Sequence, residues 1–217
     1  MRRYIYFVFL LCCAVNLLLT SCVRQKYVVM DMVHHNPGEA MTESKFLDPS
    51  FLKKNEYGAK VFFLFEAAQF GIDWKSFDPS LFPDTTEAGR WVAEKAEIIH
   101  KKYDAAKKED LQVYCMLDML VLPSLLVEKH RTELTNEQGK LDISKPYTQL
   151  CIRELMKEMF ETFPQLDGLV IRTGETYLHD APYYVGNHPV QNGMYDHITL
   201  INLLREEVCE RRNKKLF

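Results

Sequence analysis

The chain has 217 residues, of which 47% are hydrophobic, 12% aromatic and 26% charged, and its formal net charge is −3. This composition is typical of a globular protein with a sizeable core and argues against an intrinsically disordered chain. Because Lys and Arg are not in excess, the sequence also argues against a polyanion-binding protein, and nucleic acid is not an expected partner.

The first residues contain the three parts of a bacterial export signal. Arg2 and Arg3 give a positive start, residues 4–19 are apolar apart from Asn16, and Leu19-Thr20-Ser21-Cys22 closes the stretch. The apolar run is shorter than the ~20 residues that a membrane-spanning helix needs, so a permanent transmembrane helix is the weaker alternative. The pattern resembles a bacterial lipobox.

This resemblance implies a lipoprotein precursor. Residues 1–21 would be the signal peptide, Cys22 the acylated N-terminus, and residues 22–26 a lipidated tether. More than one acyl chain gives stable anchoring, so we expect an exported lipoprotein of the cell envelope, with the membrane as a partner through Cys22. Whether the protein faces the periplasm or the outer surface stays open.

Three cysteines remain after the signal and the lipidated position are set aside: Cys115, Cys151 and Cys209. An odd number of cysteines without close spacing argues against a disulfide framework or a zinc ribbon. We therefore expect them to be small buried hydrophobic residues.

Four short runs rich in Val, Ile, Phe or Tyr are predicted to be buried strands. They are Tyr27–Val33, Lys60–Phe65, Gln112–Leu117 and Gly168–Ile171. Helical patterns separate them. Because parallel neighbours need such long crossovers, the alternation predicts an α/β fold with a parallel sheet, in one domain over residues 27–217.

The helices are predicted from their caps and apolar spacing. A short helix begins at Asp48-Pro49 and ends by Gly58, and Asp84-Thr85-Thr86-Glu87 resembles a capping box. The long helix after this box has one apolar face, made of Val92, Ala96, Ile99, Tyr103 and Ala106.

Two further helices follow the third and fourth strands. One begins near Pro146 and ends before Pro164, with Ile152, Leu155, Met159 and Phe163 on one face. The other is capped by Asp196, and its inward residues are predicted to be Ile198, Ile201, Leu204 and Val208.

Polar residues follow every predicted strand directly, which is where parallel α/β proteins place their active sites. After the first two strands these are His34, His35, Asn36 and Glu39, and then Glu66, Gln69, Asp73 and Trp74. After the last two they are Asp118, and then Arg172, Glu175, Tyr177, His179, Asp180, Tyr183, Tyr184, Asn187 and His188.

Aromatic rings among carboxylates are typical of a carbohydrate site, because a sugar offers apolar faces to stack and hydroxyls to bind. Glu175 is the candidate general acid, which would protonate the leaving oxygen of a glycosidic bond. The candidate substrate-binding residues are His35, Asn36, Glu39, Glu66, Trp74, Asp118, Arg172, Tyr177, His179 and Asp180.

Each candidate also has a structural alternative. Arg172 and Glu175 could form an ion pair at the strand ends, Asp118 could cap the turn at Pro123, and the aromatic residues could pack in loops. Metal ligation by His34, Glu39, His179 or His188 is the weaker interpretation, because HxH and HExxH spacings are absent. No metal and no cofactor is therefore predicted.

Three segments carry a resemblance to a known family: residues 31–39, residues 60–66 and residues 168–177. They look like the first half of a (β/α)₈ glycosidase-like domain found in exported bacterial proteins, distantly similar to the α-glucuronidases of glycoside hydrolase family 67. In the related barrels the acid/base glutamate follows the fourth strand, which is the position of Glu175. The resemblance implies an incomplete TIM barrel of about four strand–helix units, because a whole barrel needs ~250 residues.

The leading hypothesis is thus a lipid-anchored glycoside-hydrolase-like protein that acts on a fragment of a plant or host polysaccharide. The four units would be a truncated part that is not active alone. One alternative is a carbohydrate-binding lipoprotein without catalysis, and another is a metal-dependent hydrolase.

Overall fold

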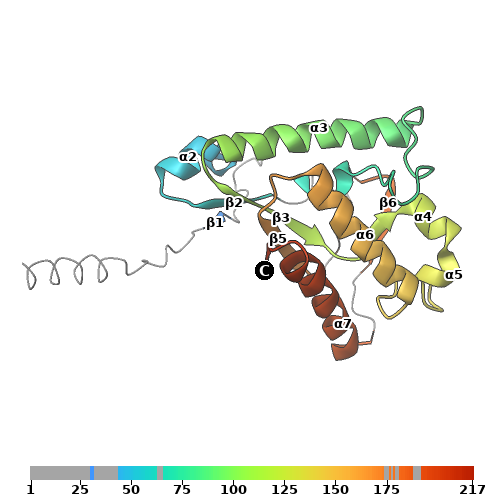
Figure 1. Cartoon of the computed structure of the whole chain (residues 1–217). Coiled ribbons are helices and arrows are strands. Elements are labelled where there is room, and N and C mark those ends of the chain that lie inside the picture. Colours follow the sequence, from blue (N-terminus) through green and yellow to red (C-terminus); the bar gives the residue numbers. More distant parts are fainter. Residues whose placement is uncertain are drawn as a thin grey trace, which may run out of the picture.

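The computed structural model describes residues 30–31, 44–62, 66–173, 176, 178, 181–187 and 192–217 (Figure 1). The predicted signal peptide, Cys22 and the tether lie outside the described residues. Within the described part of the chain, no helix is both long enough and apolar enough to cross a membrane.

The centre of the fold is a sheet of five strands, all parallel to their neighbours. The strands lie side by side in the order in which they occur along the chain. They are β1 (Met30–Asp31), β2 (Ala59–Phe62), β3 (Gln112–Asp118), β5 (Gly168–Arg172) and β7 (Lys215–Leu216). The four predicted strands are therefore confirmed where the structure describes them, and β7 adds a short fifth strand.

Helices fill the crossovers between these strands. They are α2 (Pro49–Lys54), α3 (Glu87–Lys108), α6 (Pro146–Thr162) and α7 (Met194–Leu204), which continues into the π-helical turn η4 (Arg205–Glu210). Right-handed crossovers that always advance in one direction place the helices on the same face of the sheet. A doubly wound sheet would instead reverse its strand order. The α/β class is confirmed, and the winding is that of part of a (β/α) barrel.

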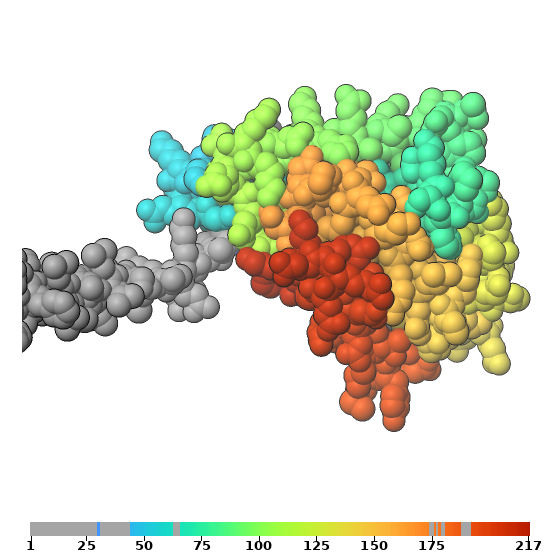
Figure 2. All heavy atoms as spheres, in the orientation of Figure 1, coloured from blue at the N-terminus to red at the C-terminus, as the bar shows by residue number. Residues whose placement is uncertain are grey.

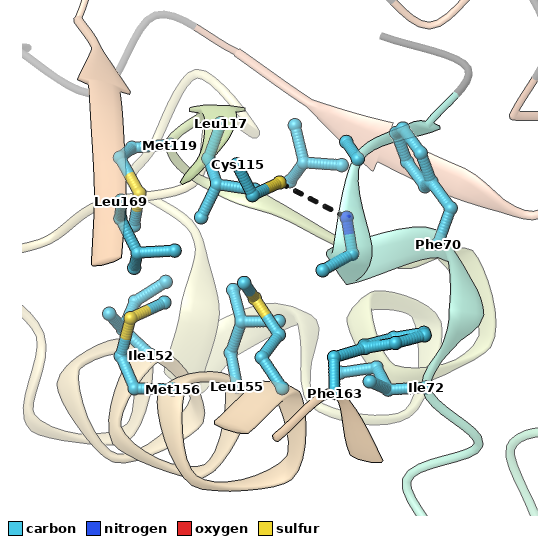
Figure 3. Close-up of a cluster of buried hydrophobic side chains, with 14 of the residues drawn as sticks. Phe70, Ile72, Cys115, Leu117, Met119, Ile152, Leu155, Met156, Phe163 and Leu169 are labelled. Carbon is cyan, nitrogen blue, oxygen red and sulfur yellow. Dashed lines mark hydrogen bonds between the residues drawn. The ribbon is translucent and has the colours of Figure 1, made fainter. Parts of the chain in front are cut away.

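The two faces of the sheet have different surroundings. Alternate side chains of β3, at Val113, Cys115 and Leu117, belong to the large core that the helices cover. Figure 3 shows residues of α6 facing β3, β5 and the segment around Phe70 in this core. The residues between them face the opposite side, where a small separate cluster contains Ala59, Val61, Tyr114 and Val170, with Met30 and Met116 against it.

The helix starts follow local chemistry. Thr86 is the N-cap of α3, and its Oγ1 accepts a hydrogen bond from the backbone N of Gly89 at 3.0 Å. The predicted capping box, with Asp84 as the cap, therefore lies two residues too early. Pro146 occupies the first turn of α6, as predicted, because that position lacks an N–H partner anyway. The predicted inward residues of both helices are buried or pack against the core.

Several short elements were not predicted. The 3-10 turns η1 (Lys45–Leu47) and η3 (Ala68–Gly71) and the helices α4 (Ser124–Lys129) and α5 (Arg131–Leu134) are too short for apolar periodicity to show them. The same holds for β4 (Val121–Pro123), which pairs antiparallel with β6 (Tyr184–Gly186). This second sheet joins the segment after β3 to the segment after β5, so it organises the carboxyl end of the main sheet.

The predicted inward face of α7 was partly wrong. Ile198 and Ile201 are 47% and 52% exposed, whereas Leu200, Leu203, Leu204 and Val208 are buried. Apolar residues occur on more than one side of α7, so periodicity alone does not show which side packs against the core; the buried side runs through Leu200, Leu203 and Leu204, at ordinary α-helical spacing. Asp196 is also not the cap: it lies in the first turn and accepts a hydrogen bond from the backbone N of Asn192 at 2.7 Å. Figure 2 shows α7, in red, at the surface beside α6.

The cysteine prediction is confirmed for Cys115 and Cys151, which are buried and free, whereas Cys209 is half-buried. Burial raises the pKa of each of the two buried thiols to about 12. At neutral pH these sulfurs are therefore protonated, and they pack as small apolar groups.

Two neighbouring residues of α7 test its orientation. We expect Leu200→Ala to lower the free energy of unfolding by about 2 to 5 kcal/mol, because it leaves a cavity in the core. Ile201→Ala removes a half-exposed side chain and should cost less than about 1 kcal/mol. Chemical denaturation of both variants measures the difference; equal losses, or a larger loss for Ile201→Ala, would contradict this orientation.

Candidate functional site at the carboxyl end of the sheet

Asp118 and Arg172 end neighbouring strands and lie directly opposite each other in the register of β3 and β5. Their side chains form an ion pair, with Arg172 Nε 3.1 Å from Asp118 Oδ1. The Asp118 side chain is 7% exposed and that of Arg172 is 27% exposed. The register therefore brings together two of the predicted substrate-binding residues at the carboxyl edge of the sheet.

The pair lies on the face that the helices leave uncovered. Asp118 follows Tyr114 and Met116 at intervals of two, and Arg172 follows Val170 in the same way, so both share the face of the small cluster. In a (β/α) barrel this face is the interior, and its carboxyl end is the mouth that carries the active site. The sequence had left open whether Asp118 caps the turn at Pro123. In the structure its side chain pairs with Arg172.

The backbone after Asp118 is strained. Leu120 has a φ of 57° and is fully buried, although a branched side chain is rarely tolerated in this left-handed region. The carbonyl of Leu120 accepts a hydrogen bond from the backbone N of Asn187 at 3.3 Å, which links the turn to the segment after β6. Strained residues cluster at binding and catalytic sites, where the surrounding structure holds them in place.

Glu66 follows β2 but is engaged elsewhere. Its carboxylate forms a close ion pair with Lys102 of α3, and its carbonyl accepts a hydrogen bond from the Tyr103 hydroxyl at 2.9 Å. Both partners belong to the helix that covers the large core. The structure thus ties Glu66 to α3 and not to the Asp118–Arg172 pair.

Two aromatic residues near the strand ends, one after β2 and one at the start of β6, are packed inside the protein. Trp74 is completely buried, lies 6.1 Å from the Phe77 ring and has a φ of 57°. Its ring offers no exposed face to a sugar, so its position fits the loop-packing alternative. Tyr184 is also buried, and burial raises the pKa of its hydroxyl, which donates to the carbonyl of Gln69 at 3.3 Å.

Two other polar residues hold loops together. Asp73 pairs with Lys75 at 3.1 Å. Asn187 accepts a hydrogen bond at Oδ1 from the backbone N of Leu141 at 2.7 Å, and its Nδ2 donates to the carbonyl of the same residue at 3.2 Å. These contacts fix the segments around the strand ends.

The remaining candidates lie outside the described residues, and their roles stay predictions. They are His35, Asn36, Glu39, Glu175, Tyr177, His179 and Asp180. The four residues considered as metal ligands, His34, Glu39, His179 and His188, lie there too. Among the residues that the structure does describe, no three His, Cys, Asp or Glu side chains gather as a metal site would require.

One concave feature beside the strand ends was missed. A pocket of about 320 Å³ lies between the segment preceding α3, the start of α4 and the residues just before β6. Of the residues that line this pocket, Tyr183 is the one that the sequence analysis had named, because it comes after a predicted strand. Ser124 and Glu128 belong to α4, which the sequence did not predict.

Comparison with known proteins gives distant structural similarities only. No family model and no curated protein sequence matches the chain. A noncanonic maltogenic α-amylase from Thermotoga neapolitana is 16% identical with a TM-score of 0.40, over 69% of this chain and 39% of that one. A glycoside hydrolase family 138 enzyme targeting pectin rhamnogalacturonan II is 14% identical with a TM-score of 0.37, over 68% of this chain and 18% of that one.

The chain thus spans less than half the length of each of these two enzymes. At such low TM-scores the similarities support no conclusion about the site. The fold assignment therefore follows from the strand order and register described above.

A double-mutant cycle tests the ion pair. Asp118→Asn and Arg172→Met should show a coupling free energy of about 1 to 2 kcal/mol in unfolding, because the carboxylate is shielded from water. The matched control is the pair of Lys75 and Asp84, also at 3.1 Å but with side chains 51% and 79% exposed, for which we expect less than about 0.5 kcal/mol. Equal coupling in the two cycles would show that the strand-end pair is not formed as described.

Proposed function

We propose that this chain is the N-terminal part of a lipid-anchored, glycoside-hydrolase-like domain that binds and cleaves a fragment of a plant or host polysaccharide. The observation that carries the proposal is the Asp118–Arg172 pair at the carboxyl ends of adjacent parallel strands, on the face that becomes a barrel interior. In the sequence, a carboxylic acid and aromatic residues follow Arg172 closely, as a site at these strand ends would need.

The pair suits recognition of a sugar. A carboxylate accepts hydrogen bonds from hydroxyl groups, while a guanidinium donates them in a fixed planar geometry. The Arg172 side chain is 27% exposed, so part of it can be reached by a ligand at the strand ends while it pairs with Asp118. Two hydroxyls of one sugar ring could be held by this arrangement.

Glu175 is the proposed general acid, three residues after Arg172. An acid that protonates a leaving oxygen must keep its proton near neutral pH, and a free positive charge nearby would oppose this by lowering its pKa. Pairing with Asp118 offsets the charge of Arg172 and so weakens this effect. The second carboxylate, or the activated water that hydrolysis also needs, would come from the strands that complete such a barrel.

The N-terminal sequence supports the proposed location. Residues 1–21 would direct export, and Cys22 would carry the acyl chains that hold the domain at a membrane of the cell envelope. The tether of residues 22–26 would leave the folded domain at the membrane surface.

A carbohydrate-binding lipoprotein without catalysis is the second candidate. It is favoured by the chemistry of the described pair, because a carboxylate already engaged by a guanidinium binds hydroxyls well but is a poor proton donor. The two candidates differ only in whether Glu175 acts as an acid.

We expect Glu175→Gln to reduce polysaccharide hydrolysis by the protein isolated from its source cell by about 10² to 10⁴-fold, because an amide is far too weak an acid to protonate the leaving oxygen. Sugar binding should persist, as the amide keeps its hydrogen-bonding capacity. Reducing-sugar release and calorimetry measure the two properties, with Glu137→Gln, an exposed glutamate, as the control.

Unchanged hydrolysis in Glu175→Gln would remove the assigned role of this residue. Glycan binding without hydrolysis by the wild-type protein would favour the second candidate.

We expect Cys22→Ser to release the protein from the membrane fraction, because an exported chain without acyl groups has no stable anchor. Fractionation of the source cells, with mass spectrometry of the N-terminal peptide, measures both location and acylation. Cys209→Ser serves as the control. A Cys22→Ser protein that still sediments with membranes after a high-salt wash would contradict the lipid anchor.

A further inference from the structure

The pocket beside the strand ends has an apolar floor and a partly polar rim. The floor contains the buried side chains of Leu81 and Phe82, together with Pro83 and Ala88. Leu125 adds a side chain that is 39% exposed, which extends the apolar surface toward solvent. A volume of about 320 Å³ is at the small end of ligand pockets, which suits one or two rings and not a long chain.

Tyr183 provides the aromatic wall of this pocket. It is half-buried, and its ring packs against the Trp91 ring with centroids 5.7 Å apart and an interplanar angle of 73°. The pKa of its hydroxyl is raised, first by desolvation and then by the nearby carboxylate of Glu87. A tyrosine held in this way offers an apolar ring and a protonated hydroxyl to the same ligand.

The charge of the rim distinguishes between classes of sugar. Among the described residues that line the pocket, Glu128 alone is charged, and the other polar groups are hydroxyls, including that of Ser124. Arg90 also lies near Tyr183, but its Nη1 donates to the carbonyl of Thr85 at 3.0 Å, and it does not line the pocket. Lys129 contacts the lining residue Ser80 but is paired with Asp78. A uronic acid would therefore meet the Glu128 carboxylate with both nearby cations already engaged, whereas hydroxyls of a neutral sugar can donate to Glu128.

The walls are joined by contacts that keep the pocket open without a ligand. The backbone N of Ser124 donates to the carbonyl of Tyr183 at 2.8 Å, which fixes α4 to the segment before β6. Lys129 of α4 pairs with Asp78 at 2.8 Å and also contacts the Ser80 hydroxyl. Lys129 and Ser80 lower the pKa of Asp78 to about 2, so this link is present across the physiological range of pH. A preformed wall reduces the conformational entropy that the protein loses when a ligand binds.

We propose that this pocket is a subsite for a neutral sugar, in which one ring stacks on Tyr183 and its hydroxyls donate to Glu128. The inference rests on the proposed function, since it assigns a substrate class to the same carboxyl end of the sheet. β4 and β6 connect the pocket to the Asp118–Arg172 pair, because β4 begins three residues after Asp118 and Tyr183 directly precedes β6. The subsite would hold one sugar of a chain whose neighbouring sugars reach the strand ends.

Calorimetry of the full chain in detergent tests the proposal with four probes: cellohexaose, xylohexaose, mannohexaose and hexagalacturonate. At least one neutral hexaose should bind more tightly than hexagalacturonate. Tyr183→Ala should weaken that binding roughly three- to tenfold, and Glu128→Gln roughly threefold. Tyr195→Ala is the matched control, because Tyr195 is a 74% exposed tyrosine on α7. The Tyr195→Ala variant should bind the neutral hexaose with the affinity of the wild type.

Each other outcome overturns the subsite. A preference for hexagalacturonate would refute its neutral class, and wild-type affinity in both pocket variants would refute its location. If binding survives both pocket variants but is lost in Arg172→Met, the subsite fails while the proposed function stands. If no probe binds to the wild-type chain at millimolar concentration, both fail. Because Glu128 is exposed, Glu128→Gln tests the proposal even if Tyr183→Ala does not fold.

Discussion

The parallel pairing of β3 with β5 places Asp118 opposite Arg172, and the candidate site depends on this register. Strand side chains alternate between faces, so a slip of one residue in either strand would turn one partner toward the helices. The alternation is enforced by the packing of Cys115, Leu117 and Leu169 in the large core. The same apolar residues that stabilise the sheet thus decide which polar residues meet at its edge.

The helices influence the candidate site because they cover one face of the sheet and leave the other face to the ion pair. The large core occupies one face of the sheet, and Lys102 of α3 holds Glu66 on that side. Among the residues that the structure describes, the opposite face carries a small apolar cluster next to the ion pair. The two carboxylates therefore lie on opposite faces of the sheet, Glu66 paired with a helix and Asp118 with the neighbouring strand, although both follow strands in the sequence.

Much of the main sheet could be predicted from sequence because the strands are apolar runs and the helices carry clear signals. The ends of β3 and β5 were found to within one residue, and Pro146 marked the start of α6. Asp118 and Arg172 were predicted as site residues because the carboxyl ends of parallel strands lie at the same edge of the sheet. Their pairing could not be predicted, because only the register shows that Arg172 lies opposite Asp118.

The missed features have tertiary causes. β4 and β6 have three residues each, and their pairing depends on loops about sixty residues apart in sequence, for which no local pattern exists. Trp74 looked like a site residue because it follows a strand, but the fold buries it. The inward face of α7 was misjudged because apolar residues occur on more than one side of this helix, and only the tertiary packing decides which side is buried. Each error arises where long-range packing overrides a local rule.

Backbone amide NMR of the chain during titration with a neutral hexaose tests whether carbohydrate binds at the carboxyl edge, because it locates the ligand on the sheet. We expect shift changes at Asp118, Arg172 and Thr173, at the carboxyl ends of β3 and β5, with Gln112 and Gly168 at the opposite ends unchanged. Changes confined to the opposite ends, or to the outer surfaces of α3 and α6, would contradict a carbohydrate site at the carboxyl edge of this sheet.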